Sequence, residues 1–354
     1  MQKPKLDYFK LISTPRGILQ HSVGPKLEPR YGYAVDDNAR ALVAADLLYS
    51  SGDSSMKRYI KIYLNNIADS QAKDGKFYCH LYDDGRKTQA GLGDWFGRSL
   101  VALAFHLTQG PALQSPTFYE IKSRTLRSMR LVLKHPELFS SLRTRSQLIL
   151  ALVYLLDTKK DTAILKCRED SRIREILKVW EKDFETSYKQ HVERDWIWPE
   201  DKITYDNGKI IQAYFLLGEI LNNNGLIKMG KSALDWYYEA TTRHGYFQSP
   251  GTNNDKFWEK GQKLPTSLEQ PLEACSLVAA LVTAGLVNKV DYLREQMLVY
   301  EWFYGKNRLN MSLVDKRGAV RDSLNYMDCS PNCGAENVVS INLAYFAIKE
   351  GLHL

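Results

Sequence analysis

The chain has 354 residues, of which 44% are apolar and 25% charged, with a formal net charge of +7. This composition argues against disorder, and no run of about 18 apolar residues predicts a transmembrane span. The densest basic stretch, Lys122–Arg130, is interleaved with apolar positions like a solvated helix face, which argues against a nucleic-acid partner. We expect a soluble cytoplasmic protein, because the start lacks the features of a signal peptide and the five cysteines suit a reducing compartment.

Apolar residues recur at spacings of three and four along most of the chain, which predicts α-helices. Strand-like alternation is scarce, and only Lys76–Tyr82 and Asn310–Val320 predict short hairpins. The sequence therefore predicts an all-α fold, with helices over Ala39–Tyr49, Tyr59–Ile67, Phe96–Leu107, Ile121–Leu133, Gln147–Leu156, Ile173–Phe184, Ile210–Leu221, Ala233–Ala240, Leu272–Leu286, Val290–Phe303 and Val338–Ile348.

Every second predicted helix begins with charged and amide residues, at about positions 36, 94, 145, 206, 269 and 336. These starts are 51 to 67 residues apart, which is the length of a helix pair with its loops. The helices that follow them are rich in small residues and suit an inner ring. We predict a single domain over 1–354, an (α/α)6 toroid of six helical hairpins, with 1–34 as an N-terminal arm near the barrel mouth. An open helical solenoid is the alternative, which the long polar connections 185–204 and 243–268 disfavour.

In a toroid, the polar helix starts would meet at one mouth and line it with carboxylates. Helix N-termini attract acids, so each of these residues also has an interpretation as a cap. Asp36 and Asp37 stand out, because adjacent helical residues point about 100° apart and two close carboxylates raise the pKa of one, as a general acid requires. Arg40, at the third acidic position of a DDxxD magnesium site, argues against a metal. The catalytic candidates are Asp36, Asp37, Asp94, Glu200, Glu269 and Glu336.

Aromatic, amide and basic residues near the same starts are candidates for sugar binding. Exposed indoles stack on sugar rings, although tryptophan at a helix junction is also common in a core, and arginine suits hydroxyl groups or an acidic sugar. His21 is the only histidine we place at the mouth, so no histidine triad is predicted. The binding candidates are His21, Tyr33, Arg40, Trp95, Arg98, Arg145, Trp198, Asp206, Asn207, Trp258, Gln270, Trp302, Asn307 and Asn332.

Several short segments form a set: Gly17–His21, Gly32–Arg40, Asp94–Leu100, Trp198–Glu200, Gln270–Ala274, Trp302–Asn307 and Asn332–Asn337. They resemble a family of (α/α)6-toroid, glycosidase-like proteins found alone or fused behind GT-B glycosyltransferases in prokaryotic carbohydrate clusters. The chain departs from the pattern at Asn337, where serine is usual, and at Ser323, where glycine is usual. The resemblance implies the toroid, a carbohydrate substrate and a glycosyltransferase partner.

The Asp36–Asp37 pair also resembles the consecutive aspartates at an inner helix start of toroidal α-mannanases, which implies roles as acid/base and nucleophile. We predict a glycoside hydrolase-like enzyme that cleaves an oligosaccharide or polysaccharide by carboxylate general acid/base catalysis, without metal or organic cofactor. One alternative is a non-catalytic glycan-binding module that serves a glycosyltransferase. Another is a polysaccharide lyase, in which Tyr33 or Tyr205 is the base and arginines neutralise a uronate.

Overall fold

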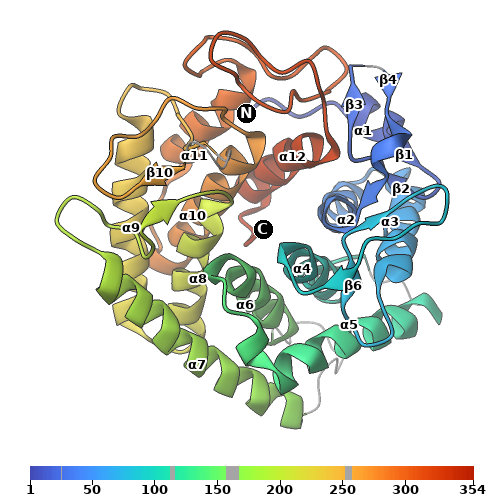
Figure 1. Cartoon of the computed structure of the whole chain (residues 1–354), viewed down its shortest axis with the longest axis horizontal. Helices are drawn as coiled ribbons and strands as arrows, with labels where there is room; N and C mark the ends of the chain where they lie inside the picture. The colour runs from blue at the N-terminus through green and yellow to red at the C-terminus, as the bar shows by residue number, and fades with distance from the viewer. Residues whose placement is uncertain (25, 112–115, 157–166, 252–256) are drawn as a thin grey trace. The chain divides into compact units, whose positions relative to one another are not determined.

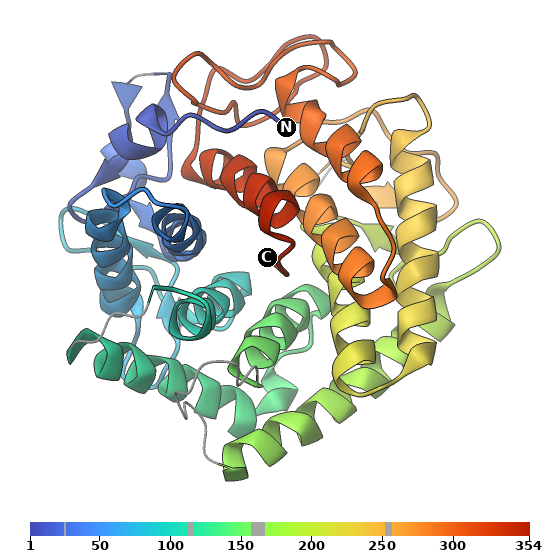
Figure 2. The ribbon, with the colours of Figure 1, turned by 180° about the vertical axis from the view of Figure 1, so that it is seen from behind.

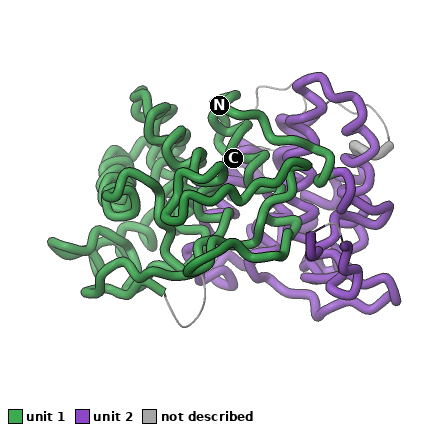
Figure 3. Tube along the Cα trace, turned by 90° about the horizontal axis from the view of Figure 1, so that it is seen from above, with its two compact units in different colours: residues 1–9, 178–354 green, residues 10–177 purple. Residues whose placement is uncertain are grey.

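The computed structural model describes residues 1–24, 26–111, 116–156, 167–251 and 257–354. Within these residues the chain forms twelve α-helices and ten strands of two residues each, so the prediction of an all-α fold is confirmed. The chain divides into two compact units, residues 10–177 and residues 1–9 with 178–354 (Figure 3). The short helix α1 (Asp7–Leu11) and the long helix α7 (Cys167–His191) pass from one unit to the other. The single domain predicted over 1–354, with its arm, stays a prediction.

The unit of residues 10–177 is built on three mostly buried helices, α2 (Val35–Ser50), α4 (Asp94–Thr108) and α6 (Leu142–Leu156). Helix α4 packs against both α2 and α6, while α3 (Met56–Ser70) packs on α2 and α5 (Pro116–Lys134) on α4 (Figure 1). Ala41 and Ala44 of α2 have no exposed surface, and such small side chains allow helices to pack closely. The predicted alternation of inner and outer helices is confirmed in this unit.

The second unit repeats the pattern with α8 (Asn207–Ile220), α10 (Pro271–Asn288) and α12 (Ala335–Glu350) as its buried helices. Helix α10 packs against α8 and α12, while α9 (Asn224–Thr242) packs on α8 and α11 (Leu293–Tyr300) on α10 (Figure 2). Gly208 is required here, because a Cβ atom would lie 2.1 Å from the backbone oxygen of Ser276. Among the described residues, α10 alone is long and apolar enough to cross a membrane, but 72% of it is buried, as in a core helix.

The six polar positions that mark the predicted inner helices lie within three residues of the observed starts of the six buried helices, while the predicted apolar ranges begin up to five residues later. The largest difference in type concerns Val290–Phe303, which forms α11 followed by a 3-10 helix over Glu301–Tyr304. A 3-10 helix is wound more tightly than an α-helix and is common at helix ends. Gly305 ends this one with a left-handed φ of 103°.

The strands form small ribbons that connect loops within each unit. The hairpin predicted over Lys76–Tyr82 is wrong, because its two strands pair with different partners. Within the described residues the antiparallel pairs are β1 (Ser13–Thr14) with β2 (Gly17–Ile18), β3 (Ser22–Val23) with β4 (Lys26–Leu27), β5 (Tyr33–Ala34) with β7 (His80–Leu81), β6 (Phe77–Tyr78) with β8 (Ala90–Gly91), and β9 (Lys202–Ile203) with β10 (Trp258–Glu259). In the other predicted hairpin, Val314 and Val320 form an antiparallel bridge.

Candidate active site

A carboxylate flanked by two arginines lies at the start of α2. An Arg98 nitrogen on α4 donates to Asp36 Oδ2 at 2.8 Å, and Arg40 lies 3.6 Å from the same oxygen. Arg40 also donates to Asp37 Oδ1 at 2.9 Å. Asp37 is buried, whereas 17% of the Asp36 side chain is exposed. Of the two candidate carboxylates, Asp36 is therefore the more accessible one.

The two arginines determine the charge of Asp36. Burial alone would raise its pKa, but the charges of Arg40 and Arg98, with the Arg98 hydrogen bond, outweigh burial and hold the pKa below its usual range. We expected repulsion from Asp37 to raise the pKa of one carboxyl, but at Asp36 the arginines reverse this direction. Asp36 is thus ionised at neutral pH. Arg40 and Arg98, which we expected to orient sugar hydroxyls, bind these carboxylates, and their contact with a sugar stays a prediction.

His80 is a neighbour of this cluster that the sequence analysis missed. Strand β7 brings it there, because Ala34, directly before α2, pairs with His80 in the β5–β7 ribbon. His80 Nε2 lies 3.1 Å from Gln20 Oε1. Burial lowers the pKa of His80, and His21 lowers it further, although Asp36 opposes the shift. The imidazole is therefore neutral at pH 7 and has a lone pair that can accept a proton.

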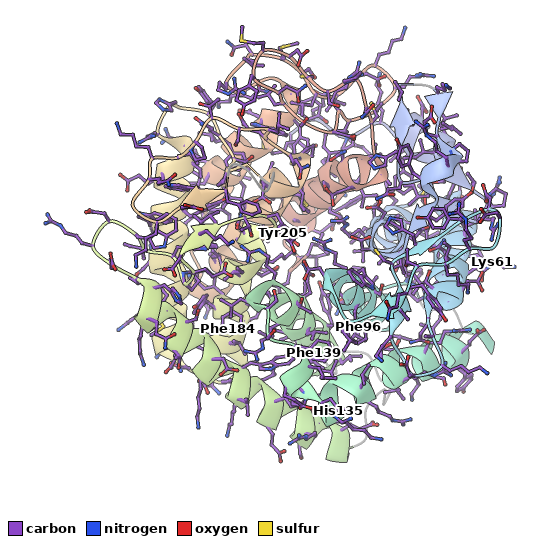
Figure 4. All side chains as sticks on the ribbon, in the orientation of Figure 1. Lys61, Phe96, His135, Phe139, Phe184 and Tyr205 are labelled. Carbon is purple, nitrogen blue, oxygen red and sulfur yellow. The ribbon has the colours of Figure 1, made fainter. Side chains whose placement is uncertain are left out.

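The start of α4 is held against α6 and against the β6–β8 ribbon. Thr144 of α6 donates to Asp94 Oδ1 at 2.6 Å, and the half-buried Trp95 indole donates to the Phe77 carbonyl at 3.0 Å. Phe96 of α4 and Phe139, which precedes α6, are labelled in Figure 4 and pack with ring centroids 5.3 Å apart. The contacts Asp36–Arg98 and Asp94–Thr144 thus join the starts of α2, α4 and α6. Arg145, a predicted sugar ligand, donates to the Phe139 carbonyl instead.

In the second unit, the predicted catalytic acid Glu269 is buried and holds neighbouring side chains in place. It has no exposed surface, and its two carboxylate oxygens accept hydrogen bonds from Trp302 Nε1 at 3.0 Å and Arg308 Nε at 3.1 Å. Burial raises its pKa, although these two donors oppose the shift. Arg308 also donates to the carbonyls of Asn325 and Tyr326, so Glu269 and Arg308 fasten this loop. The prediction of a catalytic Glu269 is therefore corrected.

Glu273 is a buried carboxyl that the sequence analysis also missed. It accepts hydrogen bonds from the Asp206 backbone N–H at 2.5 Å and from the Asn207 side-chain amide at 2.7 Å. Burial, together with the charge of Asp206, raises the pKa of Glu273 to about 7. Asp206 and Asn207 were expected to contact a sugar, but both are buried. These three residues instead connect the start of α8 to α10.

The raised pKa of Glu273 predicts a specific dependence of stability on pH. Below the ordinary pKa of about 4.5, both the folded and the unfolded forms are protonated, and the stability does not change with pH through this group. Between about pH 4.5 and 7 the unfolded state releases the proton first, so the free energy of unfolding falls by about 3 kcal/mol in total. Urea unfolding across this range should show a smaller fall for Glu273→Gln, which does not titrate. Equal slopes in the variant and the wild type would contradict this.

Three of the four predicted tryptophans are buried. Trp198 has no exposed surface and packs against Tyr237 with ring centroids 5.6 Å apart, and Trp302 is equally buried. Trp258 is 6% exposed and stacks on Trp236 with centroids 5.1 Å apart. The expectation of exposed stacking platforms is therefore corrected for these three indoles, because neighbouring aromatic rings cover them.

The other candidates of the second unit lie in loops and at helix starts. Asn307 is buried, and its amide donates to the Trp302 and Met311 carbonyls, so it shapes a turn rather than a ligand site. Glu200 and Gln270 are half-buried, Glu336 is half-buried in the first turn of α12, and Asn332 is exposed. No group of three or more His, Cys, Asp or Glu side chains within the described ranges could hold a metal ion.

Comparison with solved structures identifies the fold of the chain. No protein-family model and no curated protein matches it. Cellobiose 2-epimerase from Spirochaeta thermophila DSM 6192 is a similar solved structure, with 14% identity, a TM-score of 0.69, and coverage of 98% of this chain and 94% of that chain. D-mannose isomerase is 12% identical with a TM-score of 0.66, covering 97% of this chain and 94% of that one. The chain has the (α/α)6-toroid fold. This confirms the predicted toroid against the open solenoid.

A glycoside hydrolase is also among the similar structures. The GH76A α-1,6-mannanase from Salegentibacter sp. HEL1_6 is 15% identical, with a TM-score of 0.60 and coverage of 98% of this chain and 97% of that chain. An inactive variant of that mannanase, with two consecutive aspartates changed to asparagine, is in complex with α-1,6-mannotriose. At these identities the comparisons establish the fold alone.

Proposed function

We propose that the chain is a carbohydrate-processing enzyme that cleaves a glycosidic bond, with Asp36 as the carboxylate that acts on the sugar. The observation that carries this proposal is the state of Asp36, which two arginines keep ionised while part of its side chain is exposed. An ionised carboxylate of this kind attacks the anomeric carbon or activates a water molecule, depending on its separation from the general acid. The mannanase that loses activity without its two consecutive aspartates supports the assignment.

Within the same unit, Asp94 is our candidate for the general acid. It lies at the start of α4, is half-buried, and has one oxygen held by Thr144. Asp37 is less suited, because it is buried and bound to Arg40. We assign Asp37 a positioning role: it holds the Arg40 guanidinium beside Asp36.

His80 favours a second candidate function, the epimerisation or isomerisation of a reducing sugar. A neutral imidazole accepts the proton next to the sugar carbonyl, and return of a proton to the other face of that carbon, or to the neighbouring carbon, completes the reaction. The half-exposed His21 interacts with His80 and is the candidate for the second proton carrier. The cellobiose epimerase and mannose isomerase of the same fold support this alternative.

The lyase alternative has less support. Tyr33, its proposed base, is buried and hydrogen-bonded to Asp83 and Thr14. Burial raises its pKa above 10, so the phenol stays protonated at neutral pH. The glycosyltransferase partner and the cytoplasmic location stay predictions.

One experiment separates hydrolysis from epimerisation. The wild type, Asp36→Asn and His80→Gln are incubated with manno- and gluco-oligosaccharides in H2O and in D2O, and the products are resolved by mass. We expect shorter oligosaccharides from the wild type and His80→Gln, and none from Asp36→Asn. Full-length products that gain carbon-bound deuterium, and lose it in His80→Gln, would establish the epimerase instead. Binding without either product would contradict both and favour the glycan-binding module.

A further inference from the structure

A polar cavity of about 230 Å³ lies beside the β5–β7 ribbon in the unit of residues 10–177. Its walls come from the turn that follows β1, from α3, and from the loop that follows β7. Side chains with hydroxyl, amide and carboxylate groups line it, among them Tyr33, Asn65, Asn66 and Asp69. This cavity is smaller than the roughly 300–1,000 Å³ of pockets for drug-sized ligands, so it suits a single ring rather than a longer chain.

The β5–β7 ribbon separates the cavity from the Asp36 cluster. Tyr33 pairs with Leu81 and both line the cavity, whereas Ala34 pairs with His80. Because neighbouring residues of a strand point to opposite faces, His80 is directed to the other side of the ribbon, where its charge interaction with Asp36 places it. The cavity is therefore a site of its own, adjacent to the proposed catalytic carboxylate.

Asn66 supplies an acceptor that has no partner among the residues that the structure describes. Only 2% of this residue is exposed, and its amide nitrogen donates to the Arg16 carbonyl at 2.8 Å. Its Oδ1 atom is buried and accepts no hydrogen bond from the described residues. A buried acceptor left unsatisfied is unfavourable, and native proteins pair such groups with protein, water or ligand donors. Asn66 also lines the cavity, so a small rotation of its amide would bring this acceptor within reach of a ligand hydroxyl.

The charges around the cavity favour a neutral ligand over an anion. Arg16 lies 3.3 Å from Asp83, and Arg86 lies 2.6 Å from Asp84, so both guanidinium groups already have carboxylate partners. Lys87 donates to the backbone carbonyl of Asp69, whose own carboxylate is also at the cavity. The positive and negative groups around the cavity thus balance. The polar groups left to contact a ligand are amides, hydroxyls and the Asp69 carboxylate, which recognise hydroxyl groups.

We propose that this cavity is a secondary carbohydrate site, which binds one neutral sugar residue through Asn66, Asn65 and Asp69. The carboxylate of Asp69 and the amide oxygens accept from sugar hydroxyls, while the Asn65 amide donates to ring or hydroxyl oxygens. The Tyr33 hydroxyl, which donates to Asp83 and accepts from Thr14, forms part of the wall. The choice of sugars as ligands rests on the proposed function, but binding here needs no catalysis by Asp36.

Saturation-transfer NMR on the full chain tests this site with methyl α-D-mannopyranoside and methyl β-D-glucopyranoside as probes. The Asp36→Asn variant serves as the background, so that turnover does not interfere. We expect Asn65→Trp, an exposed position at the rim, to weaken probe binding at least tenfold, and Asn66→Ser to weaken it as well. Asn224→Trp, at an exposed position in α9, is the matched control and should bind like the background.

Three results would overturn the proposal. They are equal probe binding by Asn65→Trp and Asn224→Trp, no saturation transfer to either glycoside, or displacement of the glycosides by inorganic phosphate, which would indicate an anion site. Asn65→Trp keeps the test valid if Asn66→Ser unfolds, which thermal melting detects. Loss of the proposed hydrolase activity is a separate outcome, because it appears as absent products with probe binding retained.

Discussion

Replacement of Asp36 by asparagine is expected to lower kcat for oligosaccharide cleavage by about 10²–10⁴-fold, the usual contribution of a positioned acid or base. Asparagine keeps the shape of the side chain but removes the charge that Arg98 and Arg40 stabilise. Product formation resolved by mass gives kcat, and calorimetry with an oligosaccharide should give an affinity within a few-fold of the wild type. The control is Asp235→Asn, which removes an exposed carboxylate paired with Lys231 and should leave kcat unchanged.

The pH profile of Arg98→Met tests whether Arg98 keeps Asp36 ionised during catalysis. Arg98 helps to hold the pKa of Asp36 below its usual range, so its removal raises that pKa. Activity that requires the carboxylate is lost below its pKa, and the acid limb of kcat/KM should therefore move to higher pH in Arg98→Met. A profile that stays in place while kcat falls would show that Arg98 acts only by shaping the site. An unchanged kcat in Asp36→Asn would overturn the assignment itself.

The helical framework was predictable because its signal is local. Residues such as Ala41 and Ala44 fall on a repeating apolar face, and the polar segments before each inner helix mark where the helices begin. The pairing of β5 with β7 was not predictable from the same signal, because Ala34 and His80 lie far apart in sequence and each strand has two residues. The wrong hairpin over Lys76–Tyr82 and the missed His80 have this common cause.

The sequence predicted only part of the candidate site, because the rest depends on contacts between segments that are distant in the chain. Asp36 is identifiable by its position in a helix start, but whether it is protonated depends on Arg98, which a different helix supplies. The sequence also could not show that Trp198 and Glu269 are fully buried, since burial results from the packing of distant segments. Glu273 is part of the segment Gln270–Ala274 and lies in the first turn of α10, but its inward direction follows only from its contact with α8.

Removal of His106 is expected to lower the free energy of unfolding by on the order of 3 kcal/mol, because a buried carboxylate then loses a hydrogen-bond partner. His106 Nδ1 on α4 lies 2.8 Å from Asp46 Oδ2 on α2, and only 4% and 1% of the two side chains are exposed. His106→Ala deprives a buried carboxylate of this partner. Urea unfolding measures the change, and His135→Ala, from an exposed pair with Glu137, should cause no measurable one.

The double variant Asp46→Leu/His106→Leu distinguishes loss of the whole pair from loss of one partner. Apolar replacement of both members of a buried pair is often neutral, so this variant should recover most of the stability that His106→Ala loses. The pair joins the same two helices as Asp36 and Arg98, ten residues further along α2, which is roughly 15 Å at 1.5 Å per residue. Because the first contact sets the charge of Asp36 and the second lies far from it, His106→Ala should lose stability with kcat retained, whereas Arg98→Met should lose activity. Equal loss of kcat in both would mean that the two contacts act as one unit that fixes the rotation of α2 against α4.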